Sequence, residues 1–367
     1  MQPLPDTALL APRTLFGRGQ IRQLPSLGRE WGGRGLVLIG ASFRKGLHFK
    51  PLKEALGPDC LIVEHAGGEP TLDQAETLRE TARRHQAAWI SGIGGGSVLD
   101  LAKTAAGLFH ETVPVAAIHA GQAVQKRGIP FLAVPTTAGT GAEATPNAVL
   151  TDTRTSLKKS IRDDRFMASC IILDGGLLAG SPPDVIAHAG MDAYTQALEA
   201  GSSRKGNAWS EATALAALRL IAASLPAVQA NPAGPEADSL LAGSYLAGVA
   251  LAQARLGVVH GLAHPLGAFY HQPHGLVCAV CLPAALKLNR QALGAAYDRL
   301  SQAVGSDLTA ATESLLARLG IRNPFTGQPI IRLPEIMEQT LTSGSTQANP
   351  KTIGPAEVEW LLKRLFS

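Results

Sequence analysis

Short apolar runs alternate with helix-like segments in the first half of the chain. Strand-like runs that end in glycines or lead into a loop occur at 34–40 (RGLVLIG), 87–96 (AAWISGIGGG) and 129–141 (IPFLAVPTTAGTG). Helical composition marks 78–86 (LRETARRHQ) and 97–109 (SVLDLAKTAAGLF). Because strands that alternate with helices form parallel sheets covered by those helices, this half is predicted to be an α/β domain.

The pattern changes in the middle of the chain. Long Ala/Leu-rich segments such as 212–225 (ATALAALRLIAASL) follow, with few β-branched runs, so the second half is predicted to be mainly helical. The pair Pro182-Pro183 lies at the change and suits either a domain boundary or the first turn of a helix. We expect an α/β domain over 1–183 and an all-α domain over 184–367.

Composition argues against several classes of protein. Of the 367 residues, 46% are hydrophobic and 17% are charged, a balance typical of a soluble globular enzyme. The net charge of +4 comes from 33 basic and 29 acidic residues without a block of like charge, so no nucleic-acid partner is expected. The four cysteines do not form a disulfide framework, and no signal peptide is evident. The longest apolar run, near 240–252, falls short of the roughly 20 residues of a membrane span and is interpreted as a buried core helix; we expect a cytoplasmic protein without a membrane partner.

A glycine cluster lies between a predicted strand and its helix, in GIGGGSVLDLAK (92–103). Backbone N–H groups at such a point can approach an anion, and the helix dipole favours negative charge. Pyrophosphate is the expected ligand, although a tight strand-to-helix turn would also explain the glycines, since the full G-x-G-x-x-G fingerprint is absent. Ser97 and Asp100 have capping-box spacing, which predicts that the helix starts directly after the loop. The candidate coenzyme residues in this segment are Gly94, Gly95, Gly96, Ser97 and Asp100.

A second loop, VPTTAGTGAEAT (134–145), follows the next predicted strand. Thr136, Thr137 and Thr140 offer hydroxyl groups to phosphate or ribose oxygens, and the glycines between them allow close backbone approach. Threonines are also ordinary turn residues. Two such loops about 40 residues apart, each after a strand, nevertheless favour a dinucleotide as the ligand of both.

Four histidines fall within fifteen residues, in GVVHGLAHPLGAFYHQPHG (257–275). His260 and His264 are four residues apart and share a helix face, and His274 follows Pro273 at a predicted helix start. Histidines spaced in this way, together with a distant carboxylate, are typical of a divalent-metal site. As purely structural residues they would bury several polar rings without partners, which is costly.

Two further pairs have a spacing that requires interpretation. Asp192 and Gln196, in GMDAYTQALEA, share one helix face, either as part of a metal site or as ordinary structural residues. Cys278 and Cys281 form a C-x-x-C. Because the chain has no second pair of this kind, we interpret these cysteines as small residues on the buried side of a helix and not as a zinc or redox motif.

Several of these motifs, in this order, resemble the iron-containing, or group III, alcohol dehydrogenases. The resemblance rests on GGGSVLDLAK, PTTAGTGAEAT, DAYTQALEA, HGLAHPLGAFYHQPHG and a late NPK (349–351). It implies a dehydroquinate synthase-like fold, with an N-terminal nucleotide-binding α/β domain and a C-terminal all-helical domain. It also implies an NAD(P)-dependent oxidoreductase that transfers hydride between the coenzyme and a small alcohol or aldehyde, with one divalent metal ion, iron or zinc. The resemblance also implies a homo-oligomer, and among the possible assemblies we expect a dimer.

The resemblance assigns roles residue by residue. Asp192, His260 and His274 match metal-ligand positions, and His264 matches a position beside the nicotinamide that is assigned to proton handling or positioning. Gln196 stands where the family has a second ligand histidine. Three strong ligands with an open position suffice for a catalytic metal, so Gln196 is expected in or just outside the set of ligands.

The coenzyme region also departs from the family pattern. NAD-preferring members generally end their first strand with an acidic residue, whereas this chain has Gly40, Ser42, Arg44 and Lys45 there. This favours NADP(H) over NAD(H), although Arg44 and Lys45 could be plain surface residues. Lys158 matches a lysine that is often found near the cofactor or substrate.

Two alternatives stay open. A metal-independent enzyme resembling maleylacetate reductase would suit the replacement at Gln196, and a catalytically silent paralogue could bind nucleotide without turnover. Asp192 and the histidines argue against the silent paralogue, because such a protein has no physical need for metal-type residues. The sequence does not identify the substrate beyond a small alcohol or aldehyde.

Overall fold

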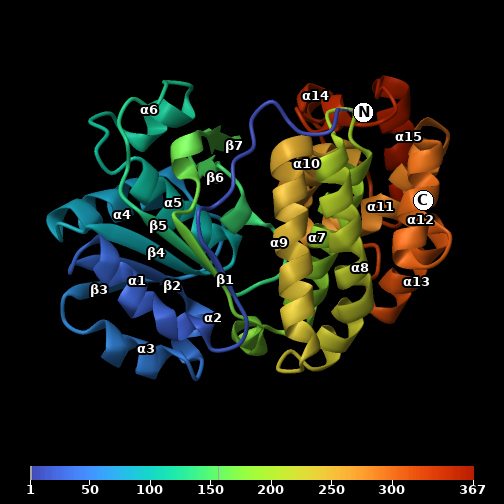
Figure 1. The fold of residues 1–367 in the computed structure, drawn as a ribbon. Coiled ribbons are helices and arrows are strands. Elements are labelled where there is room, and N and C mark those ends of the chain that lie inside the picture. Colours follow the sequence, from blue (N-terminus) through green and yellow to red (C-terminus); the bar gives the residue numbers. More distant parts are fainter. Residues whose placement is uncertain (1, 156) are drawn as a thin grey trace. The chain divides into compact units, whose positions relative to one another are not determined.

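The computed structural model describes residues 2–155 and 157–367 and divides the chain into two compact units. The first unit is Leu9–Ser181, and the second is Pro182–Ser367 with the N-terminal segment up to Ala8. Figure 1 colours the first unit mainly blue to green and the second mainly yellow to red. Helix α7 (Pro183–Ser202) begins at Pro183, so the proline pair lies both at the boundary between the units and in the first turn of a helix. The assignment of coenzyme binding to 1–183 and of metal binding to 184–367 stays a prediction.

A six-stranded parallel sheet forms the centre of the first unit, in the order β1-β8-β5-β4-β2-β3. Its strands are β1 (Thr14–Phe16), β2 (Gly35–Gly40), β3 (Cys60–His65), β4 (Trp89–Gly94), β5 (Phe131–Pro135) and β8 (Cys170–Leu173). The α-helices along the same stretch are α1 (Leu24–Trp31), α2 (Ala41–Lys45), α3 (Phe49–Leu56), α4 (Leu72–Arg84), α5 (Gly96–Gly107) and α6 (Val115–His119). The predicted α/β class of this half is confirmed.

Short elements complete the first unit. They are β6 (Asn147–Asp152) and β7 (Leu157–Arg162), which pair antiparallel, and the 3-10 helices η1 (Gln20–Gln23), η2 (Ala142–Ala144), η3 (Asp164–Phe166) and η4 (Gly175–Gly180). The sequence led us to no secondary-structure prediction over 147–162, so the β6–β7 pair is an addition to the expected fold.

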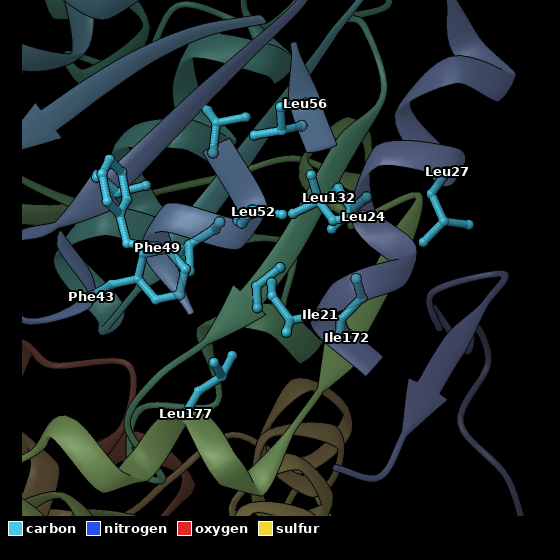
Figure 2. Packing of buried hydrophobic residues seen from close by; sticks show 14 of the residues in the cluster. Ile21, Leu24, Leu27, Phe43, Phe49, Leu52, Leu56, Leu132, Ile172 and Leu177 are labelled. Atoms are coloured by element: carbon cyan, nitrogen blue, oxygen red, sulfur yellow. The ribbon is translucent and has the colours of Figure 1, made fainter. Parts of the chain in front are cut away.

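Both faces of the sheet are buried, as a parallel sheet requires. On one face, Val37 and Ile39 of β2 belong to a hydrophobic cluster with residues of η1, α1, α2 and α3. Figure 2 shows this cluster, with Leu24, Phe49 and Leu132 among its members. The alternate strand residues are buried on the opposite face, where α5 lies against β4 and β5. The sheet is thereby a rigid support for the loops at its ends.

The chain order reverses between β2 and β4. From β2 the chain continues to β3 at one edge of the sheet, whereas from β4 it continues in the opposite direction to β5. The crevice at the carboxyl ends of two such strands is the usual place of a bound nucleotide in open α/β sheets.

Helices form the second unit. They are α7, α8 (Ala208–Ala230), α9 (Glu236–Ala254), α10 (Val258–Tyr270), α11 (His274–Leu293), α12 (Ala295–Val304), α13 (Leu308–Arg318), α14 (Leu333–Thr342) and α15 (Pro355–Phe366), with the 3-10 helix η5 (Thr346–Ala348). α7, α8 and α9 lie side by side (Figure 1). The apolar run near 240–252 lies in α9 and is largely buried, so the predicted helical half is confirmed.

By length and composition alone, α8 and α11 could cross a membrane. In the second unit, α8 packs on α7, α9 and α12, and α11 packs on α7, α10, α13 and α15. Their apolar residues therefore have partners within the unit. The expectation of no membrane partner stays a prediction.

Candidate functional site

Three helices of the second unit bring four donor side chains together. Asp192 comes from α7, His260 from α10, and His274 and Cys278 from α11. Each side chain offers one ligand atom, and these four atoms all lie within 4.8 Å of one another. Asp192, His260 and Cys278 are buried, whereas the side chain of His274 is 26% exposed. The donor cluster is therefore reached from solvent on the side of His274.

Local helix geometry places α11 in this cluster. The helix starts at His274, directly after Pro273 as predicted, and Cys278 follows one turn later on the same face. Gly275 lets α11 approach α7, because an added Cβ would lie 2.1 Å from the backbone oxygen of His188. This close approach brings His274 Nε2 to 3.7 Å from Asp192 Oδ1.

Glu199 of α7 orients His260. Its Oε2 accepts a hydrogen bond from Nδ1–H of His260 at 2.6 Å, and its Oε1 accepts from the Val259 N–H at 2.7 Å, in the first turn of α10. The opposite ring nitrogen, Nε2, then lies 3.2 Å from Asp192 Oδ1. An imidazole that is held through Nδ1 in this way presents Nε2 to a metal ion, and such an outer partner also raises its basicity.

The late NPK motif supports the same helix. Asn349 Oδ1 accepts a hydrogen bond from the Val258 N–H at 3.2 Å, and the Asn349 side chain pairs with Asn289 of α11. The first-turn N–H groups of a helix have no acceptor within the helix, so Asn349 and Glu199 together satisfy the start of α10. The position of His260 therefore depends on residues from three separate parts of the sequence.

The electrostatics of the cluster favour a divalent cation. Burial lowers the pKa of His260, but Cys278, Asp192 and Glu199 outweigh burial and raise it well above its usual value. Burial also lowers the pKa of His274, but Cys278 and Asp192 raise it, and the net result is a pKa above the usual value. For Asp192 and Cys278, burial acts to raise the pKa, yet the histidines bring it below the usual value. The four groups are thus strongly coupled, and a carboxyl, a thiol and two imidazoles are the types of side chain that bind a divalent cation.

Gln196 lies next to this cluster. It follows Asp192 by one turn of α7, is 4% exposed and forms a side-chain hydrogen bond with Asp192 that lowers the pKa of that carboxyl. Within the described residues, its Oε1 has no hydrogen-bond partner. A buried polar atom without a partner is costly, so this oxygen suits a metal ion or a metal-bound water. Its place among the ligands stays a prediction.

His264 lies one turn after His260 on α10 and is exposed. Its ring stacks on that of His274, with centroids 5.1 Å apart and an interplanar angle of 22°. The structure therefore places His264 on the solvent side of the donor cluster. That position suits exchange of a proton with substrate or water, and its catalytic role stays a prediction.

Two residues of this site were missed by the sequence analysis. Both cysteines of the C-x-x-C motif are buried, as interpreted, but Cys278 also joins the donor cluster. The available signal was its spacing of four residues from His274. Glu199 was missed as well, although its spacing of seven residues from Asp192 puts both on one face of α7.

In the first unit, three predicted coenzyme segments meet at one edge of the sheet. Gly40 ends β2, Gly94 ends β4, and Thr136 directly follows β5. The Thr136 N–H donates to the Gly94 oxygen at 3.0 Å, and an added Cβ at Gly40 would lie 3.8 Å from the Gly94 Cα. These residues flank the point between β2 and β4 where the chain order reverses, which is where such sheets bind nucleotides.

The glycine and threonine loops pack on each other. A Cβ added to Gly95 would lie 3.3 Å from Thr137 Oγ1. A Cβ added to Gly96 would lie 2.9 Å from Thr140 Oγ1. Gly95, Gly96 and Ser97 are partly exposed, and the first N–H groups of α5 have no acceptor within the helix. The two loops therefore form a surface, here called the cradle, whose N–H groups are of the kind that binds phosphate; its binding of a dinucleotide stays a prediction.

The predicted capping box of Ser97 and Asp100 is wrong. The helix begins at Gly96, with Gly95 as its N-cap and no side-chain cap. Asp100 is buried, and its Oδ2 accepts a hydrogen bond from the Val149 N–H of β6 at 3.0 Å. The N-cap is thus Gly95, two residues before Ser97, and the aspartate points inward. Its predicted contact with the coenzyme is not tested.

Lys103 ties α5 to the threonine loop. Its Nζ donates to the backbone oxygens of Ala142, Thr145 and Asn147 at 2.5, 2.8 and 2.6 Å. Burial lowers the pKa of Lys103 to about 8, and burial raises the pKa of Asp100 to about 6. The loops thus rest on a buried, largely charged network.

The remaining predicted coenzyme residues lie near these loops. Ser42 and Lys45 are exposed on α2, directly after Gly40. Arg44 lies 3.8 Å from a carboxylate oxygen of Glu64, and its guanidinium lies over the Phe49 ring. Lys158 of β7 forms an ion pair at 2.7 Å with Glu69, in the loop before α4.

Comparison with known proteins decides the family. Residues 11–175 match the family model described as iron-containing alcohol dehydrogenase, and residues 186–366 match the model of the C-terminal part of the Fe-containing alcohol dehydrogenase family. The chain is also 32% identical over 345 residues to 1,3-propanediol dehydrogenase from Klebsiella pneumoniae, which covers 88% of this chain and 86% of that one. The chain belongs to the iron-containing alcohol dehydrogenase family.

Further similarities agree with this family. Lactaldehyde reductase from Escherichia coli (strain K12) is 35% identical over 257 residues, 69% of this chain and 66% of that one. The solved structure of a 1,3-propanediol oxidoreductase has a TM-score of 0.89 at 28% identity, over 98% of this chain and 99% of that one. A sulfoacetaldehyde reductase from Bifidobacterium kashiwanohense, solved with NAD+, has a TM-score of 0.91 at 24% identity over 98% of both chains and shares the fold. The predicted family, fold class and enzyme class, an oxidoreductase acting on alcohols and aldehydes, are confirmed.

Proposed function

We propose that this chain is a metal-dependent alcohol dehydrogenase or aldehyde reductase that transfers hydride between a nicotinamide coenzyme and a small alcohol or aldehyde. The observation that carries this proposal is the convergence of Asp192, His260 and His274 from three helices onto one point. The printed names of the relatives, 1,3-propanediol dehydrogenase and lactaldehyde reductase, support a small substrate of this class.

We infer that Asp192, His260 and His274 hold one divalent metal ion, iron or zinc. A carboxylate and two imidazoles suit both metals, and Glu199 fixes the orientation of one imidazole. We propose that Gln196 lies in or just outside the ligand set, where its Oε1 would gain a partner. When bound, such an ion supplies a Lewis acid that polarises an alcohol or carbonyl oxygen.

The chain's own residues account for the other requirements of the reaction. The buried carboxylate and imidazoles fix the position of the reacting oxygen, and the partly exposed His274 marks the side from which substrate enters. His264, exposed and stacked on His274, takes up or supplies the proton of the hydroxyl group at a ring nitrogen.

For the coenzyme, we propose NADP(H) in preference to NAD(H), bound by the glycine and threonine loops of the first unit. No acidic residue ends β2, and α2 carries Ser42, Arg44 and Lys45 directly after Gly40, which suits a 2′-phosphate. Glu64 works against this preference because it partly neutralises Arg44. Measured kcat/KM with NADPH and with NADH decides the point, and a tenfold advantage of NADH would overturn it.

We also propose, from the sequence and the family, that the protein is cytoplasmic. We propose that it forms a homo-oligomer and expect this to be a dimer. Light scattering on the purified protein gives the mass of the assembly directly. A mass that stays at that of one chain across concentrations would overturn the oligomer.

The proposed function is tested by metal removal and return. Protein purified without chelator is assayed with a panel of small aldehydes and reduced coenzyme, then again after stringent metal removal and after addition of zinc or ferrous iron. We expect turnover only with metal. Full activity of metal-free protein would favour a metal-independent enzyme like maleylacetate reductase, and tight coenzyme binding without any turnover would favour the silent paralogue.

A further inference from the structure

We propose that Cys278 is a protein ligand of the metal ion, so that the site consists of one carboxylate, two imidazoles and one thiolate. This inference rests on the proposed metal-dependent function and identifies a ligand that the sequence analysis set aside. In this arrangement the thiolate of α11 supplies the fourth ligand that the resemblance led us to expect at the position of Gln196 on α7.

The distances between donor atoms support four-coordination that includes sulfur. For bonds of about 2.0–2.1 Å to nitrogen or oxygen and about 2.3 Å to sulfur, tetrahedral ligands lie about 3.3 Å (N/O to N/O) or about 3.6 Å (N to S) apart. The structure has 3.2 Å between His260 Nε2 and Asp192 Oδ1, and 3.7 Å between His274 Nε2 and Asp192 Oδ1. Cys278 Sγ lies 3.6 Å from His274 Nε2. These three of the six edges lie within about 0.4 Å of the tetrahedral values, and all the donor atoms lie within 4.8 Å of one another.

The orientation of the side chains agrees with these distances. Because Glu199 receives the Nδ1–H of His260, the Nε2 atom of that ring faces Asp192 and the cluster. His274 and Cys278 are one turn apart on α11 and point to the same side of the helix. The Cys278 sulfur is therefore aimed at the point that the other three donors share.

Gln196 is a weaker candidate for the fourth position. Its Oε1 has no hydrogen-bond partner among the described residues, but an amide oxygen is an uncharged and therefore weaker ligand than a thiolate. A thiolate adds a second negative ligand, so that Asp192 and Cys278 together balance the charge of a dication. Thiolate ligands favour zinc over the harder metals, and we expect this site to prefer Zn²⁺ to Fe²⁺.

Cys281 provides a matched control. It lies three residues after Cys278 on α11 and is also buried, but it is not one of the four converging donors. Replacing either cysteine by serine removes one buried thiol from the same helix. Only the loss of Cys278 is expected to alter the metal site.

The test uses Co²⁺ as a spectroscopic substitute for zinc in the full-length protein. Wild-type protein and the Cys281→Ser variant are expected to bind one equivalent and to show a sulfur-to-cobalt charge-transfer band in the near ultraviolet. The Cys278→Ser variant is expected to lose this band and at least tenfold in affinity for Zn²⁺ in competition with a chelator. X-ray absorption of the zinc-loaded wild-type protein is expected to show one sulfur at about 2.3 Å.

The outcomes separate this inference from the proposed function. One equivalent of Co²⁺ without the charge-transfer band, or a band that Cys278→Ser leaves unchanged, overturns the thiolate ligand and leaves the metal site standing. Failure of folded wild-type protein to bind Co²⁺ or Zn²⁺ overturns both. If Cys278→Ser does not fold, the X-ray absorption spectrum of the wild-type protein decides alone, since a shell without sulfur contradicts the inference.

Discussion

Glu199 accepts hydrogen bonds from two groups of α10 at once, the Nδ1–H of His260 at 2.6 Å and the backbone N–H of Val259 at 2.7 Å. One buried carboxylate thus fixes both the imidazole and the start of the helix that carries it. Glutamine has only one oxygen acceptor, so it cannot replace both contacts.

We expect Glu199→Gln to weaken metal binding about 10- to 100-fold, as changes to the outer partners of ligand histidines do. Competition with a coloured chelator measures this. The control is Glu313→Gln, which removes an exposed carboxylate paired with Lys287. Equal zinc affinity of Glu199→Gln and wild-type protein would show that Glu199 does not act on the metal.

His264→Gln is expected to lower kcat about 100-fold or more, the range typical of a general acid–base group, while the metal content stays unchanged. The pH dependence of kcat is expected to lose one titrating step. His271→Asn is the control, because His271 is exposed at the end of α10 in the left-handed backbone region, which asparagine tolerates. A normal kcat in His264→Gln would leave water as the proton carrier.

Gln196→His combined with Cys278→Ser converts the proposed ligand set into one carboxylate and three imidazoles. Because nitrogen and oxygen ligands discriminate less against iron than a thiolate does, the ratio of iron to zinc in the purified protein is expected to rise. Elemental analysis of wild-type, single and double variants grown with both metals measures the ratio. An unchanged ratio in the double variant would place Gln196 outside the site.

Gly275→Ala is expected to lower the free energy of unfolding by about 1–3 kcal/mol, the typical cost of forcing an extra methyl group into a packed interior. The new Cβ would collide with the His188 backbone oxygen and push α11 away from α7. The separation of His274 from Asp192 would widen, so metal affinity should fall as well. Urea unfolding measures the first effect, and Gly33→Ala, whose Cβ would meet no atom within 4 Å, is the control.

Stability is expected to depend on pH through Glu143. It is buried in η2, and burial raises its pKa to about 7, from 4.5, against the opposing effect of Lys103. Because the folded-state pKa is the higher one, the stability contribution is fully present below pH 4.5 and is lost as the pH rises through about 7. Relative to wild-type protein, Glu143→Gln should therefore gain stability between pH 5 and pH 8.

Thermal unfolding at a series of pH values measures this difference, at about 2–4 °C for each kcal/mol if the unit Leu9–Ser181, which contains Glu143, unfolds cooperatively. Glu30→Gln, at an exposed ion pair with Arg13, is the control. A difference in melting temperature between Glu143→Gln and wild-type protein that is constant from pH 5 to pH 8 would contradict the assignment.

The elements of the fold were predictable because their signals are local. Strand-like runs that end in glycine, such as Gly40 and Gly94, correspond to β2 and β4, and the Ala/Leu-rich segments correspond to α8 and α9. The β6–β7 pair was not predictable in this way, because it forms a separate two-stranded sheet and only three of its twelve residues, Ala148, Leu150 and Ile161, are buried.

The site was predictable only in part. His260 and His264 are four residues apart, so the sequence predicts that both lie on one helix face. In the structure His260 is buried among the donor side chains, whereas His264 is exposed. Packing against α7 and α11 decides between them, and sequence spacing does not contain that information. Cys278 and Glu199 were missed for a related reason: each is one of several polar or small residues on its helix, and only the tertiary contacts single it out.

The buried ammonium group of Lys103 acts in the first unit much as a structural ion would. Three backbone oxygens lie 2.5–2.8 Å from it, two in the segment between β5 and β6 and one at the first residue of β6. This cation is attached to the chain and cannot dissociate. Because the lysine supplies this charge itself, the loop that we propose for the coenzyme does not need a metal ion to hold its shape, and metal removal is expected to leave it in place.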